Sequence, residues 1–206
     1  MDSQQRRGGA ERDAPRRSIP AMIAAARAGA EEAYQEFLAA YGPRLYGYFY
    51  RAIGSHHEAE DLLGEMMLRL VRGLPAYNDR GRFEPWLFSI AANLVRDRIR
   101  RARASPAAAS LEAETDGGAT LAETLGADQE AVEAPLIRRE DGAAVVEALE
   151  KIDERSRQMV LLRHFGQLSF REIAEIFDCP IGTVLARVHR ALKGLRAVLE
   201  ERDESD

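Results

Sequence analysis

The sequence has a single cysteine, Cys179, among its 206 residues. One cysteine excludes an internal disulfide and a multi-cysteine zinc site within one chain. No run approaches the roughly eighteen apolar residues that a membrane span needs. The charged N-terminus lacks the apolar core of a secretory signal, and no glycine-rich phosphate loop is present. We therefore expect a cytoplasmic protein with no membrane insertion, no metal and no cofactor.

Net positive charge is also absent, because 34 Asp and Glu outnumber 29 Lys and Arg; the formal net charge is −5 and the pI is about 5.5. That balance is unusual for a nucleic-acid-binding protein, but the charges are unevenly distributed. Residues 105–135 contain seven acids and no lysine or arginine, whereas residues 96–103 contain five arginines and one acid. Local patches govern contact with phosphates, so the global sign does not exclude DNA binding.

Hydrophobic residues make up 46% of the chain and charged residues 31%, which favours soluble, packed, helical domains. We predict an all-α protein with two small helical domains, over residues 18–104 and 136–202. Residues 1–17 are polar and rich in arginine and glycine, and we expect a disordered tail. We expect residues 105–135 to form a flexible acidic linker.

The most informative stretch covers residues 168–199. Ser169 and Glu172 have the spacing of a capping box, which predicts the start of a short helix. Asp178 and Cys179 break that helix, and Pro180 suits the first turn of the next one. Apolar residues then recur at steps of three and four, which predicts a buried face made of Ile181, Val184, Val188, Ala191, Leu192, Leu195 and Leu199.

The opposite face of that second helix is polar and cationic. It contains Ala186, His189, Arg190 and Lys193, with Gly182, Thr183 and Arg187 towards its edges. Two helices joined by a tight turn, the second with a cationic outer face, predict a helix-turn-helix with its recognition helix. The alternative is an ordinary helical hairpin with a solvated charged face.

The first domain is expected to consist of helices near residues 18–27, 31–53, 57–74 and 84–103. Gly42 and Pro43 should kink or divide the second of these. Ser55 and Glu58 form a second candidate capping box. The third helix is expected to bury Leu62, Leu63, Met66, Met67, Leu70 and Val71. In the second domain, helices near residues 143–152 and 155–165 precede the helix-turn-helix.

Histidines and carboxylates cluster where the third helix begins. His56 and His57 precede an acidic first turn, a composition that a metal or acid–base site also has. Adjacent histidines point in different directions, however. Acidic residues in a first turn also stabilise a helix through its dipole, so their presence needs no catalytic or metal-binding role. An acidic protein-docking face is the preferred functional interpretation.

The fourth helix ends in arginines. Asn93, Arg96, Arg100 and Arg103 follow at helical steps on one face. Cations favour a helix C-terminus, but five arginines in eight positions exceed what a cap requires. An asparagine between apolar neighbours is suited to holding an unpaired base.

Three stretches in this order, EAEDLLGEMMLRLV, FEPWLFSIAANLVRDRIRR and LSFREIAEIFDCPIGTVLARVHRALKGLR, resemble bacterial extracytoplasmic-function sigma factors. The resemblance covers about residues 21–103 (region 2) and 145–199 (region 4). It implies a subunit without chemistry of its own, monomeric when free. Its partners would be core RNA polymerase, promoter DNA and a cognate anti-sigma factor.

The resemblance also implies roles for particular residues. Those that dock on polymerase would be Glu60, Asp61, Leu62 and Glu65. Those at the −10 element would be Trp86, Asn93, Arg96, Arg98, Arg100 and Arg101. Those at the −35 element would be Ser169, Thr183, Leu185, Ala186, Arg187, His189, Arg190 and Lys193.

The chain departs from the family pattern at two of these positions, Leu185 and Ala186, and at Gly64, which precedes Glu65. Gly64 stands where members often have Gln, Leu185 where many have Arg or Lys, and Ala186 where many have Ser. We therefore expect base contacts to depend on Arg187 and His189 together with Arg190. Two other functions remain as alternatives. One is a free-standing helix-turn-helix regulator, and the other is a helical enzyme using the histidine–carboxylate cluster.

Overall fold

The computed structural model describes residues 18–104 and 139–203. Within these ranges every regular element is an α-helix, and no helix there is long and apolar enough to cross a membrane. The predicted all-α class is confirmed. The expectations for the tail, residues 1–17, and for the linker, residues 105–135, lie outside the described residues.

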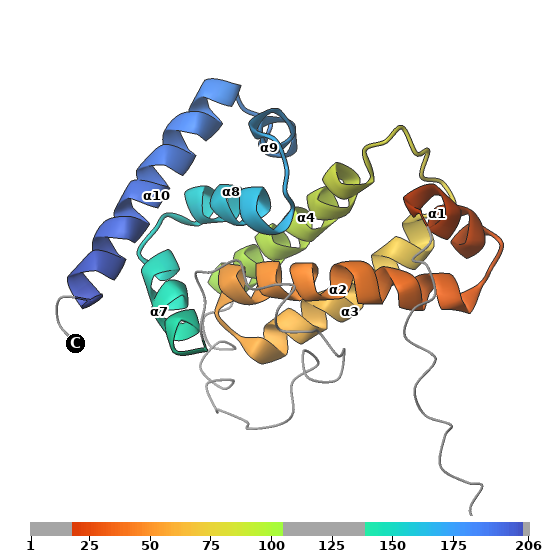
Figure 1. Cartoon of the computed structure of the whole chain (residues 1–206), viewed down its shortest axis with the longest axis horizontal. Helices are drawn as coiled ribbons and strands as arrows, with labels where there is room; N and C mark the ends of the chain where they lie inside the picture. The colour runs from red at the N-terminus through yellow and green to blue at the C-terminus, as the bar shows by residue number, and fades with distance from the viewer. Residues whose placement is uncertain (1–17, 105–138, 204–206) are drawn as a thin grey trace, which may run out of the picture.

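The first domain consists of α1 (Ile19–Arg27), α2 (Glu31–Ile53), α3 (His56–Gly73) and α4 (Phe83–Ala104) (Figure 1). Helix α2 packs against all three of the others. Its C-terminus is closed by Gly54 at φ +86°, a conformation that suits glycine. The centre of the core is aromatic, and the rings that are almost fully buried are Phe37, Tyr48, Phe49, Phe83 and Phe88.

Gly42 and Pro43 were expected to kink or divide α2, and division is wrong, because a single helix runs through both residues. A proline removes one backbone hydrogen bond, here the one to the carbonyl of Ala39. Tyr41, Gly42 and Leu45 are all buried at this point. Packing on the core therefore holds the helix together where local propensity would interrupt it.

The second domain consists of α7 (Arg139–Glu150), α8 (Glu154–Phe165), α9 (Phe170–Phe177) and α10 (Ile181–Asp203). The capping box at the start of α9 is complete. Glu172 N donates to Ser169 Oγ (3.3 Å) and Ser169 N donates to Glu172 Oε2 (2.8 Å). Asp178, at φ +47°, ends α9, and Pro180 immediately precedes α10. The tight turn between these two helices is the predicted helix-turn-helix geometry.

Four apolar residues that were predicted to be buried, on α3 and α10, are partly exposed. Val71 is 41% exposed and Met67 is only half-buried, although the helical spacing predicts both in the core. On α10, Ile181 is 47% exposed and Leu192 is 51% exposed. The packed neighbours cover only part of each apolar stripe, so residues at its edges remain in contact with solvent.

The two domains pack on each other, which the sequence did not predict. Helix α8 lies against α2, and both α8 and α9 contact α4 (Figure 1). Buried residues of both domains form one continuous hydrophobic cluster.

Candidate nucleic-acid interface

Helix α3 presents the acidic face that the sequence suggested for docking. The side chain of Asp61 is 70% exposed, and that of Glu65 is half-buried and pairs with Arg69 over 2.6 Å. Glu60 is half-buried as well. Leu62 differs, because it is only 4% exposed and belongs to the core. Leu62 therefore packs α3 on the core, and its predicted contact with polymerase stays a prediction.

Two exposed apolar side chains on α3 were missed from sequence. Leu68 is 57% exposed and Val71 is 41% exposed. At about 100° per residue, Leu68 lies almost in line with Asp61 on the helix surface. Gly64, between them, has no neighbouring atom within 4 Å of the position that a Cβ would occupy. The seven-residue step from Asp61 to Leu68 is the signal that could have identified this apolar extension of the acidic face.

The adjacent histidines diverge, as their sequence positions implied. His56 Nδ1 lies 2.6 Å from Tyr46 Oη, and its ring stacks on Tyr50 at 4.0 Å between centroids. His57 instead lies 3.4 Å from Asp61. Burial, and secondarily the charge of Glu60, raises the pKa of Tyr46 to about 12, so the phenol is neutral. Across residues 18–104 and 139–203, no three His, Cys, Asp or Glu side chains are grouped to hold a metal ion.

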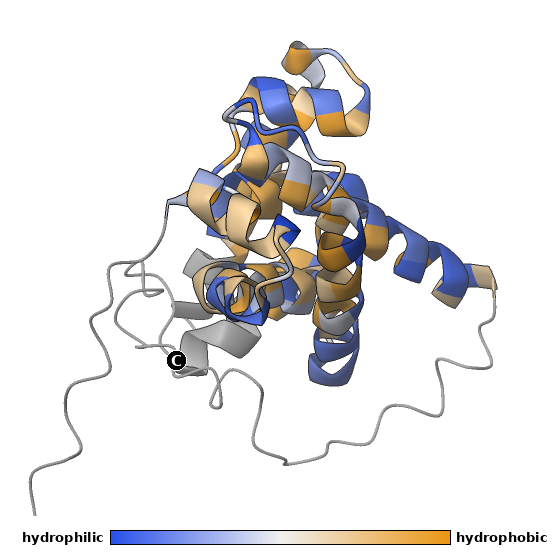
Figure 2. Ribbon diagram, turned by 90° about the vertical axis from the view of Figure 1, so that its right-hand side faces the viewer, coloured by the Kyte–Doolittle hydropathy of each residue, from blue (hydrophilic) through white to orange (hydrophobic). Residues whose placement is uncertain are grey.

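The N-terminal half of α4 combines an aromatic cluster with an exposed amide. Trp86 is half-buried, and its ring lies 4.5 Å from that of Tyr77. Asn93 is exposed, and its Oδ1 accepts a hydrogen bond from Arg96 Nη2 (2.5 Å). The C-terminal end of α4 projects from the body as a hydrophilic segment (Figure 2). Helix α4 therefore has an exposed amide, that of Asn93, followed by an arginine-rich C-terminal segment.

The arginines of α4 differ in their surroundings. The guanidinium of Arg96 lies over the ring of Phe177 in α9, 5.5 Å from its centroid. Arg98 forms an ion pair with Glu58 of α3, so Glu58 does not complete the second candidate capping box with Ser55. Arg100 pairs with Asp97 over 3.0 Å but remains 79% exposed, and Arg101 is exposed.

Helix α10 presents the predicted polar face to solvent. Val184 and Val188, at 0% and 4% exposure, fix the opposite side of the helix in the core. The members of the −35 set that this orientation leaves exposed on α10 are Thr183, Leu185, Ala186, His189, Arg190 and Lys193. Ser169 is also exposed, but its hydroxyl belongs to the capping box that orients α9.

Arg187 lies at the edge of that face, and its guanidinium contacts two residues of the same domain, Asp153 and Ser156. Its Nη1 donates to Asp153 Oδ1 (3.1 Å) and lies 3.3 Å from Ser156 Oγ. Burial alone would raise the pKa of Asp153. Hydrogen bonds from Ser156 and the charges of Arg187 and Arg190 outweigh burial and hold the pKa below its ordinary value. Asp153 is therefore ionised near neutral pH, and it competes with any external acceptor for Arg187.

Comparison with known protein families matches two models, in the order in which the domains occur. Residues 37–105 match "Sigma-70 region 2". Residues 142–195 match "Sigma-70, region 4". The first match spans most of α2 and all of α3 and α4, and the second runs from α7 into α10.

Curated relatives match across nearly the whole chain. The ECF RNA polymerase sigma factor SigW of Bacillus subtilis is 30% identical over 185 residues, which cover 89% of this chain and 97% of the relative. The RNA polymerase sigma factor CarQ of Myxococcus xanthus is 33% identical over 175 residues, which cover 85% of this chain and 94% of the relative.

Solved structures share the fold. CnrH, in complex with the cytosolic domain of CnrY, matches with a TM-score of 0.60 and 23% identity, over 88% of this chain and 96% of CnrH. The sigma factor RpoE of Bartonella quintana, in complex with the anti-sigma factor NepR, matches with a TM-score of 0.59 and 21% identity. That match covers 81% of this chain and 96% of RpoE.

Proposed function

The chain belongs to the extracytoplasmic-function family of RNA polymerase sigma factors. We propose that three separate surfaces of the chain bind core polymerase, the −10 element and the −35 element. A sigma factor binds core RNA polymerase and directs promoter-specific transcription initiation. The domain of residues 18–104 would dock on polymerase and open the −10 element. The domain of residues 136–202 would bind the −35 element. The protein would work in the cytoplasm, without catalytic residues or a cofactor.

We assign polymerase docking to the exposed face of α3. Asp61 and Glu65 supply negative charge there, and Leu68 supplies an apolar contact of the kind that gives an interface its affinity. Gly64 leaves the middle of this face without a side chain, so the backbone of α3 can approach a partner helix closely.

We assign the −10 element to α4. Trp86 and Asn93 would hold an unstacked base, whose extrusion costs a few kcal/mol that stacking and hydrogen bonds offset. Arg96, Arg98, Arg100 and Arg101 would contact phosphates, which adds affinity and salt dependence rather than sequence preference.

We assign the −35 element to the exposed face of α10. Its orientation is the observation that supports the proposal most strongly, because buried valines fix one side while cationic and small residues lie on the other. A recognition helix needs this arrangement to enter the major groove. Leu185 and Ala186 offer no charge to a base, so Arg187, His189 and Arg190 would supply the polar contacts.

We further propose that a cognate anti-sigma factor holds this chain inactive until a stress signal releases it. The two solved structures described above are both complexes, CnrH with CnrY and RpoE with the anti-sigma factor NepR. A partner of this type would compete with polymerase for the exposed face of α3.

A pair of variants separates docking from DNA recognition. Asp61→Ala combined with Glu65→Ala should weaken binding to core polymerase while leaving the DNA-binding domain folded. The matched control is Glu31→Ala combined with Glu32→Ala, which removes two exposed acids from the start of α2. Equal loss of binding in both double variants would contradict the docking assignment. Promoter binding with no measurable affinity for core polymerase would favour the free-standing regulator instead.

A further inference from the structure

A cavity of about 660 Å³ lies where α7, α8 and α10 face the C-terminal end of α2 (Figure 1). This volume is in the range of small-molecule sites in proteins, roughly 300–1,000 Å³. Most of the residues that line it belong to the second domain. None of the residues assigned above to polymerase, to the −10 element or to the −35 element is among them. The surfaces proposed above therefore give this cavity no function.

The walls of the cavity consist mainly of apolar side chains. Those side chains belong to Val145, Leu149, Val160, Leu161, Phe165, Val188, Leu192 and Leu195. Leu192 is 51% exposed, whereas Val188, one turn earlier on the same helix, is buried. An apolar ligand in the cavity would remove such an exposed leucine from water, which favours binding.

One wall carries a positive charge that lacks a carboxylate partner. The guanidinium of Arg51 lies 5.2 Å from the centroid of the Phe165 ring. Its Nε is buried without a hydrogen-bond partner, and no carboxylate in the part of the chain that the structure describes forms an ion pair with this side chain. Glu150, on α7, lies instead against Gly54, 3.2 Å from the position of a Cβ there. Burial lowers the pKa of Arg51, so an anion would be attracted more strongly here than in water.

The polar groups beside Arg51 also suit an anion. Burial, and secondarily the charge of Arg51, hold the pKa of His164 below its usual value, so its neutral imidazole can donate one hydrogen bond. Gln167 lines the cavity with a neutral amide. Arg163 lines it too, but its Nη1 donates to the carbonyl of Leu168 (2.9 Å). No Asp or Glu is among the described residues that line the cavity, so its polar groups complement a negative charge.

We propose that this cavity binds an anionic amphiphile, namely a carboxylate with an unbranched apolar tail. The carboxylate would lie on Arg51 and His164, and the tail would lie along α8 and α10. An arginine can form two parallel hydrogen bonds to a carboxylate, and partial burial strengthens them. Each methylene group of the tail that enters the cavity adds to the affinity. A ligand with the charge alone, or with the tail alone, would use only part of the site.

Isothermal titration calorimetry of the full chain with decanoate is the direct test. We expect saturable binding to a single site. Acetate, which lacks the tail, and decanol, which lacks the charge, should each bind about tenfold more weakly or worse. Between hexanoate and decanoate, the affinity should rise about threefold to fourfold for each added methylene group, as expected from the burial of that group.

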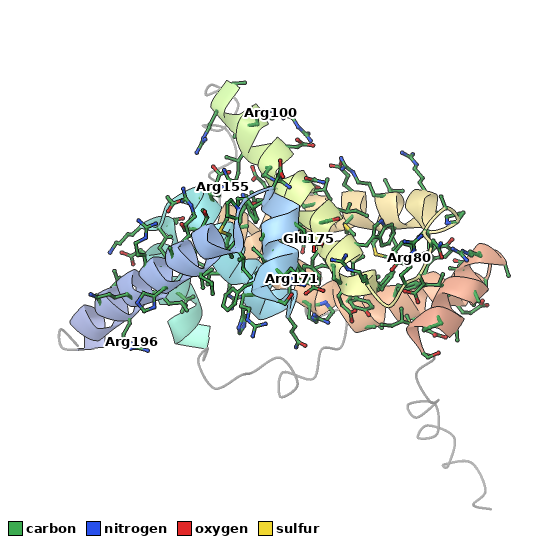
Figure 3. All side chains as sticks on the ribbon, turned by 90° about the horizontal axis from the view of Figure 1, so that it is seen from above. Arg80, Arg100, Arg155, Arg171, Glu175 and Arg196 are labelled. Atoms are coloured by element: carbon green, nitrogen blue, oxygen red, sulfur yellow. The ribbon has the colours of Figure 1, made fainter. Side chains whose placement is uncertain are left out.

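Arg51→Gln tests the contact with the carboxylate, because it removes the charge and keeps a polar side chain. The affinity for decanoate should fall about tenfold or more, and the affinity for decanol should not change. Arg196→Gln is the matched control. Arg196 is exposed on the C-terminal half of α10 (Figure 3) and does not line the cavity, so its loss should change neither affinity.

Leu192→Glu tests the location of the site. A carboxylate at this position would repel the ligand, and the affinity for decanoate should fall about tenfold or more. Ile181→Glu is its matched control, because Ile181 is 47% exposed on the same helix but does not line the cavity. In NMR titrations of the wild-type chain, decanoate should shift the methyl resonances of Val145 and Val160.

Several results would overturn the proposal. Absence of saturable decanoate binding would do so. Equal affinity for decanol and decanoate would show that the charge of Arg51 is not used, and an equal loss of both ligands in Arg51→Gln would show that this side chain only shapes the cavity. Equal losses in Leu192→Glu and Ile181→Glu would place the binding elsewhere. None of these titrations involves polymerase or DNA, so their failure would leave the proposed function unaffected.

Discussion

Arg187 Nη1 donates to Asp153 Oδ1 over 3.1 Å, which links the edge of the recognition face to the residue that caps α8. Asp153 accepts from Ser156 N over 3.1 Å at the same time. One carboxylate therefore stabilises a helix start and restrains an arginine that we assign to DNA. The two roles can be separated, because asparagine caps a helix about as well as aspartate but lacks the charge.

Asp153→Ala should lower the free energy of unfolding by about 0.5–2 kcal/mol, the usual cost of losing an N-cap. Asp153→Asn should retain most of that stability, because its side-chain oxygen can still accept from Ser156 N. Urea denaturation followed by circular dichroism measures both. Equal destabilisation by the two substitutions would show that the charge, and not the cap, stabilises α8.

The stability that the charge of Asp153 does contribute should depend on pH. Its pKa is held below the ordinary value in the folded protein, so the folded state favours the ionised form. The contribution is therefore present above the unfolded-state pKa of about 4 and is lost as the pH falls through the lower folded-state value. The difference in urea midpoint between wild type and Asp153→Asn should shrink on acidification. A difference that stays constant from neutral pH into that acidic range would contradict this interpretation.

Arg190→Ala should weaken binding to promoter DNA while leaving polymerase binding intact. Arg190 is exposed on α10, where its Nε donates to the backbone oxygen of Ala186 (3.2 Å). Loss of one bidentate arginine–base pair of hydrogen bonds costs about 1–3 kcal/mol of discrimination. Fluorescence anisotropy with a duplex that carries the −35 element measures the change. Arg196→Ala, which removes an exposed arginine further along α10, is the control, and an equal loss there would mean that only net charge matters.

Removal of arginines from the end of α4 should change the salt dependence of DNA binding. Arg100 and Arg101 are exposed at the hydrophilic end that Figure 2 shows. For each phosphate that the variant no longer neutralises, the slope of log affinity against log salt should fall by about 0.7 on single-stranded DNA. Titrations of the Arg100→Ala and Arg101→Ala double variant at several salt concentrations measure the slope. Lys151→Ala, with its exposed cation outside the proposed interface, should leave the slope unchanged.

Much of the helix pattern is predictable because it depends on local chemistry. The capping box of Ser169, the break at Asp178 and the buried side of α10 all follow from residues within a few positions of one another. The effect of Pro43 is not predictable in this way, because distant residues that pack on α2 decide it. Val71 and Leu192 depart from the predicted burial because periodicity gives the direction of a side chain but not how far its neighbours extend.

The contact between the domains could not be predicted from local patterns either. Gly47 and Gly166 look like ordinary small residues until Phe165 and Phe88 are brought opposite them. Similarly, the spacing of Glu58 to Ser55 predicts a capping box, whereas in the fold the Glu58 carboxylate pairs with Arg98. Tertiary packing decides which side chains far apart in the sequence contact each other. A sequence pattern predicts only contacts between residues that are close in the sequence.

Run-off transcription tests the central claim most directly. The reaction would contain purified core RNA polymerase, this protein and a DNA fragment from upstream of its own gene. We expect a discrete transcript that requires the protein and that disappears with the Asp61→Ala and Glu65→Ala double variant. Absence of that transcript, together with no measurable binding of the wild-type chain to core polymerase, would contradict its assignment as a sigma factor.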